Sequence, residues 1–302
     1  MTTVRGLGEV GLIERLRRRL ARPAAVKVGI GDDAAVVRGA GGHWWLFASD
    51  MLVEGVHFRR SQVPARWIGW KALACNVSDV AAMGGVPRWA VVSLGLPATT
   101  PVAFVDAVYD GLDRCARRYA MAIVGGDTVR APQLIIDVAI IGSVRPAQLV
   151  RRSGARVGDQ LFVTGRLGGS YRSGRHARFM PRVPEAQALV RQCRLHAMMD
   201  LSDGLASDAW QMSRASGVRL RLQASRIPRA SSARTLQQAL MDGEDFELLF
   251  AVSPQAARQV PARLGTTPVT HIGAAVAHGV GVELESPQGH IAPLVPTGFR
   301  HF

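Results

Sequence analysis

The chain has 302 residues, a formal net charge of +14 and an apolar fraction of 48%. This length suits one large or two ordinary domains, and the composition is typical of a globular protein with a sizeable core. The three cysteines are far apart and form no CxxC pair, which argues against a disulfide framework or a structural zinc site. The apolar stretches are too short to cross a bilayer, and the arginine-rich start resembles no signal peptide, so we expect a cytoplasmic protein without a membrane partner.

The positive charge comes almost entirely from scattered arginines, because Lys27 and Lys71 are the only lysines. A nucleic-acid-binding protein would be expected to gather basic and aromatic residues on one face, a pattern that is not seen here. We therefore predict no specific nucleic-acid partner, although the positive field would attract anionic substrates such as nucleotides.

Apolar periodicity in the first half predicts alternating helices and strands. Leucines and isoleucines at helical spacing indicate a helix that includes Leu12 and Leu20. Strands are expected at 44–48, 52–58, 89–96, 121–124 and 134–144, with helices at 67–83 and 104–119. The first of these two helices should end at Gly84-Gly85. This alternation predicts a mixed α/β domain.

An arginine- and glycine-rich stretch around 145–160 marks the expected domain boundary, so we divide the chain into residues 1–148 and 149–302. The second half predicts strands at 161–164, 218–222 and 246–252 and a helix at 205–216, with a glycine- and arginine-rich loop at 165–178. We therefore expect a second α/β domain.

Several carboxylates stand beside small residues, often at the ends of predicted strands. They occur in the motifs GIGDD (29–33), FASD (47–50), NVSD (76–79), GGDT (125–128), DLSDG (200–204) and GED (243–245). A carboxylate just past a buried strand points into the mouth of a cleft in many α/β folds. Converging carboxylates repel one another unless a cation neutralises them, and oxygen ligands select Mg²⁺ or a similar hard ion. Together with nearby glycines, the pattern predicts a metal–nucleotide site.

Each motif also has a simpler structural interpretation. An aspartate before glycine is more often a turn residue, and Ser202 or Asp203 could cap the helix that follows. Asn76 and Asp79 could form an ordinary polar stripe on a helix. Recurrence of the pattern favours the metal site over these alternatives.

No ordinary phosphate-binding or nucleophile motif is present. The sequence contains no GxxxxGK(S/T) loop, no HRD-type catalytic loop and no GxSxG elbow. Any phosphoryl transfer would therefore depend on metals and on positioning.

The chain resembles the thiamine-monophosphate kinases of the PurM-like (aminoimidazole ribonucleotide synthetase) superfamily from Gly8 to Phe302. The resemblance is carried by GIGDDA (29–34), SDMLVEGVHF (49–58), NVSDVAAMG (76–84), GGDTVR (125–130), DLSDGL (200–205), GEDFEL (243–248) and the terminal GFRHF (298–302). It implies an α/β (α+β) PurM-like fold of two mixed α/β domains, with the N-terminal domain dimerising through a shared β-barrel. The implied activity is phosphorylation of thiamine monophosphate to thiamine diphosphate, with ATP as co-substrate and several Mg²⁺ ions.

The resemblance also assigns site residues, motif by motif. It implies metal contacts for Asp33, Ser49, Asp50, Asp79, Asp127, Asp200 and Asp203. It implies ATP contacts for Gly126, Asp127, Arg152 and Ser202, and thiamine monophosphate contacts for His57, Glu244 and Phe299. No side chain is expected to act as a nucleophile or base. An aromatic ring beside a carboxylate suits a cationic thiazolium, and a histidine can bond a phosphate. Outside their motifs, His57 and Phe299 would more simply be structural.

The sequence departs from the family pattern in three places. Ala48 stands where Ser or Thr is frequent, and Asp242 stands where a glycine is common. The segment 166–190 is short and arginine-rich, which puts its nucleotide contacts in doubt. Alternative functions are another PurM-like ATP-dependent enzyme, of the aminoimidazole ribonucleotide or selenophosphate synthetase type, or a non-catalytic binder of nucleotides or nucleic acids. A selenophosphate synthetase would normally carry a reactive cysteine near its N-terminus, and none precedes Cys75.

Overall fold

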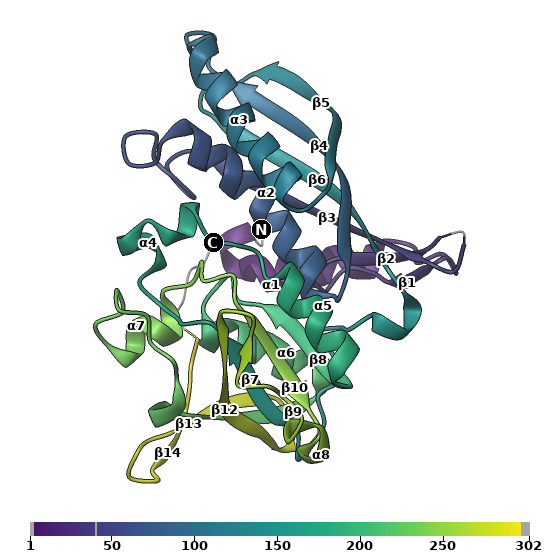
Figure 1. Ribbon diagram of the computed structural model, residues 1–302, viewed down its shortest axis with the longest axis vertical. Coiled ribbons are helices and arrows are strands. Elements are labelled where there is room, and N and C mark those ends of the chain that lie inside the picture. The colour runs from purple at the N-terminus through teal and green to yellow at the C-terminus, as the bar shows by residue number, and fades with distance from the viewer. Residues whose placement is uncertain (1–2, 40, 297–302) are drawn as a thin grey trace.

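The computed structural model describes residues 3–39 and 41–296, which fold around two sheets (Figure 1). The first half opens with helix α1 (Val4–Arg19) and builds a six-stranded sheet in the order β1-β2-β3-β6-β4-β5. Strands β4 and β5 pair in parallel, and the other neighbours are antiparallel. The strands are β1 (Val26–Val28), β2 (Ala35–Arg38), β3 (Trp44–Val53), β4 (Val86–Leu96), β5 (Ala122–Arg130) and β6 (Ile135–Val144).

Two helices, α2 (Ala65–Ala82) and α3 (Val102–Arg118), cover one face of this sheet (Figure 1). Helix α3 buries one stripe that includes Val108 and Leu112, as expected for an amphipathic helix. Helix α2 is buried around most of its circumference, because the second half of the chain packs on its outer side. It is therefore the element that both halves share.

The second half forms another mixed sheet, in the order β14-β13-β9-β12-β7-β10-β8, with β11 paired to β12. Its strands are β7 (Gln160–Thr164), β8 (Leu195–Asp200), β9 (Val218–Gln223), β10 (Leu248–Val252), β11 (Arg263–Leu264), β12 (Thr267–His278), β13 (Gly281–Glu285) and β14 (Ile291–Pro293). Its helices are α4 (Ser170–Ser173), α5 (Val183–Gln192), α6 (Leu205–Ser216), α7 (Leu236–Met241) and α8 (Pro254–Ala257). Short 3-10 turns lie at Pro146–Gln148, Arg175–Ala177 and Ala224–Arg226.

Buried apolar residues join the two halves. One cluster packs Ala81 and Ala82 of α2 against Leu189 of α5 and Phe250 of β10. Residues 145–159 connect the two sheets, and the domain division after residue 148 stays a prediction. None of the helices within the described ranges has the length and apolar character needed to span a bilayer.

Two strand predictions need correction. The expected strands at 44–48 and 52–58 are one strand, β3, which ends at Val53; the chain then turns at Gly55 and returns through a bridge between Glu54 and Phe58. The fully buried Phe58 anchors this turn in the core. The GGDT motif was expected to follow a strand, but β5 continues through it to Arg130 because the whole motif pairs with β4.

Among the residues that the structure describes, no helix packs on the sheet face opposite α2 and α3, which we call the uncovered face. The side chains of Phe47, Met51, Trp89 and Val91 are exposed there, although all are large and apolar. The rings of Trp45 and Trp89 lie together on this face, with centroids 5.7 Å apart. Within the described residues both sheets are open, so the shared barrel implied by the resemblance stays a prediction.

The close crossing of α2 and α3 gives a test of the fold. A methyl group at Gly69 of α2 would lie 1.8 Å from the backbone oxygen of Val108, so Gly69→Ala must push the helices apart. We expect a loss of about 1–3 kcal/mol in the free energy of unfolding, measured by denaturant titration. The matched control is Gly11→Ala in α1, where the added methyl lies 3.5 Å from its nearest neighbour and should cost nothing. Equal stabilities of the two variants would contradict this packing.

Candidate active site

Carboxylates from both halves of the chain meet beside α2. Asp50 comes from β3, Asp79 from α2 and Asp200 from the end of β8. The charges of Asp50, Asp200 and Asp33 all act on Asp79, and the charge of Asp203 acts on Asp50. The structure therefore brings five of the predicted metal-binding aspartates into one region, although Asp50 and Asp79 lie within their elements rather than beyond strand ends.

Burial and repulsion make this region unfavourable for negative charge. Burial, followed by the charges of Asp137, Asp203 and Asp33, raises the pKa of Asp50 to about 6. Burial and the charge of Asp33 raise the pKa of Asp200 to about 8, despite a short hydrogen bond from Ser78. These carboxyl groups need a counter-charge to remain ionised together.

Arg152 supplies part of that counter-charge. Its guanidinium forms an ion pair with Asp33, and its backbone N–H donates to the Asp32 carboxylate at 3.0 Å. The same guanidinium donates to Gln211 of α6 at 2.8 Å. Arg152, predicted to contact ATP, here lies against the first aspartates of the cluster.

The cluster also holds polar atoms without hydrogen-bond partners. Buried oxygens of Asp33, Asp208 and Asn76 accept no hydrogen bond in the described structure. Such atoms are costly unless a ligand or ion completes them, so the donor chemistry fits a hard divalent cation. Among the described residues, however, no three His, Cys, Asp or Glu side chains are already arranged to hold a metal ion.

Two predicted site residues, Ser49 and Asp127, lie on the other face of the sheet. The Ser49 hydroxyl donates to Asp137 at 3.0 Å, and the register places Asp137 and Asp127 on either side of Ser93. Side chains of direct partners in a sheet point to the same face. The uncovered face therefore carries a polar row made of Ser49, Ser93, Asp127 and Asp137. Asp50 follows Ser49 and so points to the helix-covered face. Asp127 and its neighbour Gly126 are exposed on edge strand β5.

A second charged cluster lies around the buried ammonium of Lys71. Lys71 Nζ donates to Glu244 Oε1 at 2.6 Å and to the backbone oxygen of His57 at 3.0 Å. His57 Nδ1 accepts a hydrogen bond from Val53 N, so its ring proton lies on Nε2. His176 Nδ1 lies 3.1 Å from Glu244 Oε2. Burial alone would raise the pKa of Glu244, but His176 and Lys71 outweigh it and hold that pKa below its usual value.

The backbone joins the DLSDGL and GEDFEL motifs. Glu244 N donates to Ser202 O at 2.6 Å, and Phe246 N donates to Leu201 O at 2.8 Å. Gly243 has a φ of 70° and passes so close to Ser202 that a side chain would lie 2.8 Å from its carbonyl oxygen. The predicted ATP residue Ser202 and the predicted substrate residue Glu244 are thus held side by side.

Side chains of the GEDFEL motif fix the segment 165–182. Asp245 accepts from Gly168 N at 2.8 Å and pairs with Arg175, while Glu247 accepts two hydrogen bonds from Arg182. Two arginines of this segment, Arg175 and Arg182, therefore pair with carboxylates. Asp242, which replaces a common glycine, adopts a right-handed helical backbone and accepts from Gly169 N at 2.9 Å.

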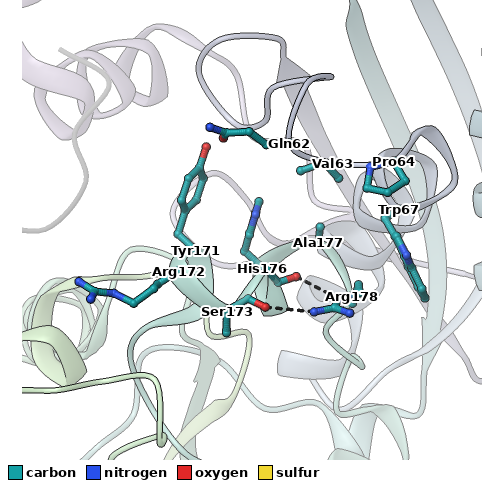
Figure 2. Close-up of a pocket in the computed structure, with 11 residues that line it drawn as sticks. Gln62, Val63, Pro64, Trp67, Tyr171, Arg172, Ser173, His176, Ala177 and Arg178 are labelled. Atoms are coloured by element: carbon teal, nitrogen blue, oxygen red, sulfur yellow. Dashed lines mark hydrogen bonds between the residues drawn. The ribbon is translucent and has the colours of Figure 1, made fainter.

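A cavity of about 570 Å³ lies beyond His176 (Figure 2). Tyr171 stacks on His176 with ring centroids 4.4 Å apart, and Trp67 lines the opposite side. The cavity is thus bordered by residues of both halves, next to Glu244.

The motifs assign no individual role to several members of these clusters, namely Asp32 of the GIGDD motif, Lys71, Asp137, His176 and Asp208. Lys71 gave one usable signal, because a lysine in an otherwise apolar helix suggests a buried partner. Asp137 gave a similar signal, since it interrupts an apolar strand. The predicted substrate residue Phe299 lies outside the described residues.

Comparisons with known proteins agree with this architecture. Residues 31–144 match the model for AIR synthase related protein, N-terminal domain, and residues 156–285 match that for AIR synthase related protein, C-terminal domain. The curated thiamine-monophosphate kinase of Rhodopirellula baltica is 39% identical over 311 residues, which cover 97% of each chain. The chain belongs to the thiamine-monophosphate kinase family.

Other members of the thiamine-monophosphate kinase family support the assignment. The enzyme of Aquifex aeolicus is 33% identical over 98% of each chain. The solved structure of AaThiL complexed with AMPPCP and TMP is 32% identical, has a TM-score of 0.88 and covers 100% of this chain and 99% of that one. Both PurM-like domains are therefore present in the family arrangement.

The pairing of Glu247 with Arg182 gives a test of how the site is supported. Glu247 is 1% exposed, so Glu247→Ala leaves the Arg182 guanidinium without its main partner. We expect a loss of about 3–5 kcal/mol in the free energy of unfolding, measured by denaturant titration. Glu283→Ala is the control, because its pairs with Arg219 and Arg221 are more exposed and should contribute about 1 kcal/mol or less. Equal losses of unfolding free energy in the two variants would show that the buried Glu247–Arg182 pair stabilises the fold no more than a surface ion pair does.

Proposed function

We propose that this protein transfers the γ-phosphoryl group of ATP to thiamine monophosphate, giving thiamine diphosphate and ADP. The observation that carries the proposal is the likeness over the whole chain to AaThiL complexed with AMPPCP and TMP. AMPPCP is an ATP analogue, so that relative holds nucleotide and acceptor together. The motifs that would contact both ligands are present in this chain.

We propose that six aspartates and Ser49 hold several Mg²⁺ ions. The residues are Asp33, Ser49, Asp50, Asp79, Asp127, Asp200 and Asp203. Supporting this assignment are the buried carboxylates without enough counter-charge and the unpartnered oxygen of Asp33. When bound, the ions would neutralise charge on the phosphates. Ser49 and Asp127 lie on the uncovered face, so they would serve a different part of the site from Asp79.

The nucleotide would contact Gly126, Asp127, Arg152 and Ser202. A side chain at Gly126 would lie 1.8 Å from the backbone oxygen of Val92, so this position requires glycine, and its exposed backbone is open to a phosphate. Arg152 can exchange a carboxylate partner for a phosphate, since both suit its planar guanidinium.

The acceptor would bind at His57 and Glu244, with Phe299 as the third predicted contact. His57 carries its ring proton on Nε2, the nitrogen that can donate to a phosphate oxygen. The acceptor phosphate is already ionised at neutral pH, so an oxygen of that group can attack in line without a general base. The residues of this chain then need only orient the two phosphates and exclude water.

We further propose that two chains associate through the uncovered face of the first sheet. The exposed apolar residues Phe47, Met51, Trp89 and Val91 support this, because a face of this kind is normally covered by another surface. A second copy of the same face would provide a matching apolar surface and could close the two sheets into a barrel.

The proposed activity predicts a specific acceptor. Purified protein with ATP and Mg²⁺ should form ADP and thiamine diphosphate from thiamine monophosphate, measured by coupled ADP release and chromatography. Unphosphorylated thiamine and aminoimidazole ribonucleotide precursors should give no reaction, and chelation of Mg²⁺ should stop turnover. Asp79→Asn is the control against a contaminating kinase, with turnover reduced on the order of a hundredfold or more. The absence of thiamine diphosphate would overturn the proposed function.

The proposed dimer predicts that a single glutamate introduced on the uncovered face will separate the two chains. Wild type should sediment at twice the 32.4 kDa chain mass, and Met51→Glu should sediment as a monomer because it buries a second carboxylate beside that of Asp137 in the proposed interface. Val102→Glu is the control, since Val102 is more exposed but lies at the start of α3, on the opposite side of the sheet. A monomeric wild type, or a dimeric Met51→Glu, would exclude this interface.

A further inference from the structure

Lys71 is a lysine in the middle of a buried helix. Its side chain is 1% exposed, and it is one of only two lysines in an arginine-rich sequence. A buried ammonium is strongly unfavourable unless it is paired and fully hydrogen-bonded. Such a residue needs a reason beyond packing, because an apolar side chain of similar length would fill the same space.

Three groups surround the ammonium, and two of them fix it in place. The His57 backbone oxygen accepts at 3.0 Å, and His176 Nδ1 lies at 3.3 Å. The third partner is the Glu244 carboxylate at 2.6 Å. An ammonium has three N–H donors; the third can bond His176 Nδ1 only when the ring proton is on Nε2, because a protonated Nδ1 donates to Glu244 instead. The carboxylate is thereby held at a fixed point from the opposite half of the chain.

The position of Glu244 depends on this contact. Its backbone has a φ of 54°, a left-handed conformation that a non-glycine residue keeps only when its surroundings impose it. Its side chain is 26% exposed, but Glu244 Oε2 is buried and accepts no hydrogen bond in the described structure, so one oxygen of the carboxylate still lacks a donor. Its negative charge is already compensated by Lys71, which makes it a directed hydrogen-bond acceptor more than a free charge.

We propose that Lys71 is a positioning residue that acts through Glu244: it sets the place and the charge of the carboxylate that recognises the organic part of the phosphoryl acceptor. The inference rests on the proposed function, in which Glu244 contacts thiamine monophosphate. Recognition by a compensated carboxylate favours an N–H donor, such as the amino group of an aminopyrimidine, over the charge of the thiazolium alone. The sequence pattern had suggested the charge.

The adjoining cavity fits this role. His176, which lies within reach of both Lys71 and Glu244, stacks on Tyr171 and forms part of the cavity wall (Figure 2). Trp67 lies on the same cavity and one helical turn before Lys71 in α2. Aromatic rings near a directed acceptor are the surroundings that a flat heteroaromatic ring prefers.

The test is a double-mutant cycle with Lys71→Met, Glu244→Gln and the double variant, using steady-state kinetics with each substrate varied in turn. Lys71→Met should raise the KM for thiamine monophosphate by roughly tenfold or more while changing the KM for ATP by less than about twofold. The double variant should have the same KM for thiamine monophosphate as Glu244→Gln, because Lys71 no longer acts on substrate binding once the carboxylate charge is gone, although the two variants differ in stability. Lys27→Met is the matched control, since Lys27 Nζ donates to the backbone oxygen of Ala24 at 3.2 Å in an exposed position.

Three results would overturn the proposal. One is a Lys71→Met variant with an unchanged KM for thiamine monophosphate. Another is an equal rise in the KM for thiamine monophosphate and the KM for ATP, which a merely structural role would produce. The third is a double variant whose KM for thiamine monophosphate differs from that of Glu244→Gln; this comparison also serves if Lys71→Met alone does not fold, because the double variant buries no unpaired charge. Failure of the proposed function is separate: it appears as a wild type that forms no thiamine diphosphate.

Discussion

Burial of charge beside helix α2 is the constraint on which the rest of the structure depends. The helix packs against the first sheet on one side and against α5 and β8 on the other, so Lys71, Asn76 and Ser78 on its middle turns are buried away from bulk water. Asp79 on this helix faces Asp50 and Asp200, and Lys71 on the same helix faces Glu244. Opposite charges are thus separated along one buried element. Neither half of the chain could provide this environment alone, because the partners come from both.

The two ends of α2 carry different chemical demands. Around Asp79 the negative charge exceeds the positive charge that Arg152 supplies, and buried oxygens lack hydrogen-bond partners. Around Lys71 the ammonium and the Glu244 carboxylate balance each other, and Nζ donates to Glu244 and to the His57 backbone oxygen. A site with surplus negative charge suits cations and the phosphates they accompany, whereas a balanced one suits directed hydrogen bonds. This division is consistent with a phosphoryl-transfer region beside an acceptor-binding region.

The GEDFEL motif shows how one short segment serves several parts of the site. Glu244 faces Lys71, Asp245 holds the loop at Gly168, and Glu247 pairs with Arg182. Phe246 stacks on Phe179 with ring centroids 3.9 Å apart, which packs the residues just before β10 against the segment 165–182. The left-handed backbone at Glu244 and Phe246 makes this distribution possible, and the surrounding contacts offset its strain.

Local sequence patterns were enough to predict many of the helices and strands and the acidic character of the site. Apolar periodicity placed the helix at 205–216 where α6 lies, and the aspartate motifs indicated an acidic cluster. Those signals are local, because helix periodicity and residue type depend on neighbouring positions. Only the tertiary structure decided that Ser49 and Asp127 lie on the opposite sheet face from Asp50, since strand register is a long-range property. It also decided the pairing of Lys71 with Glu244: the two residues are far apart in the chain, and burial between the two halves makes their charges depend on each other.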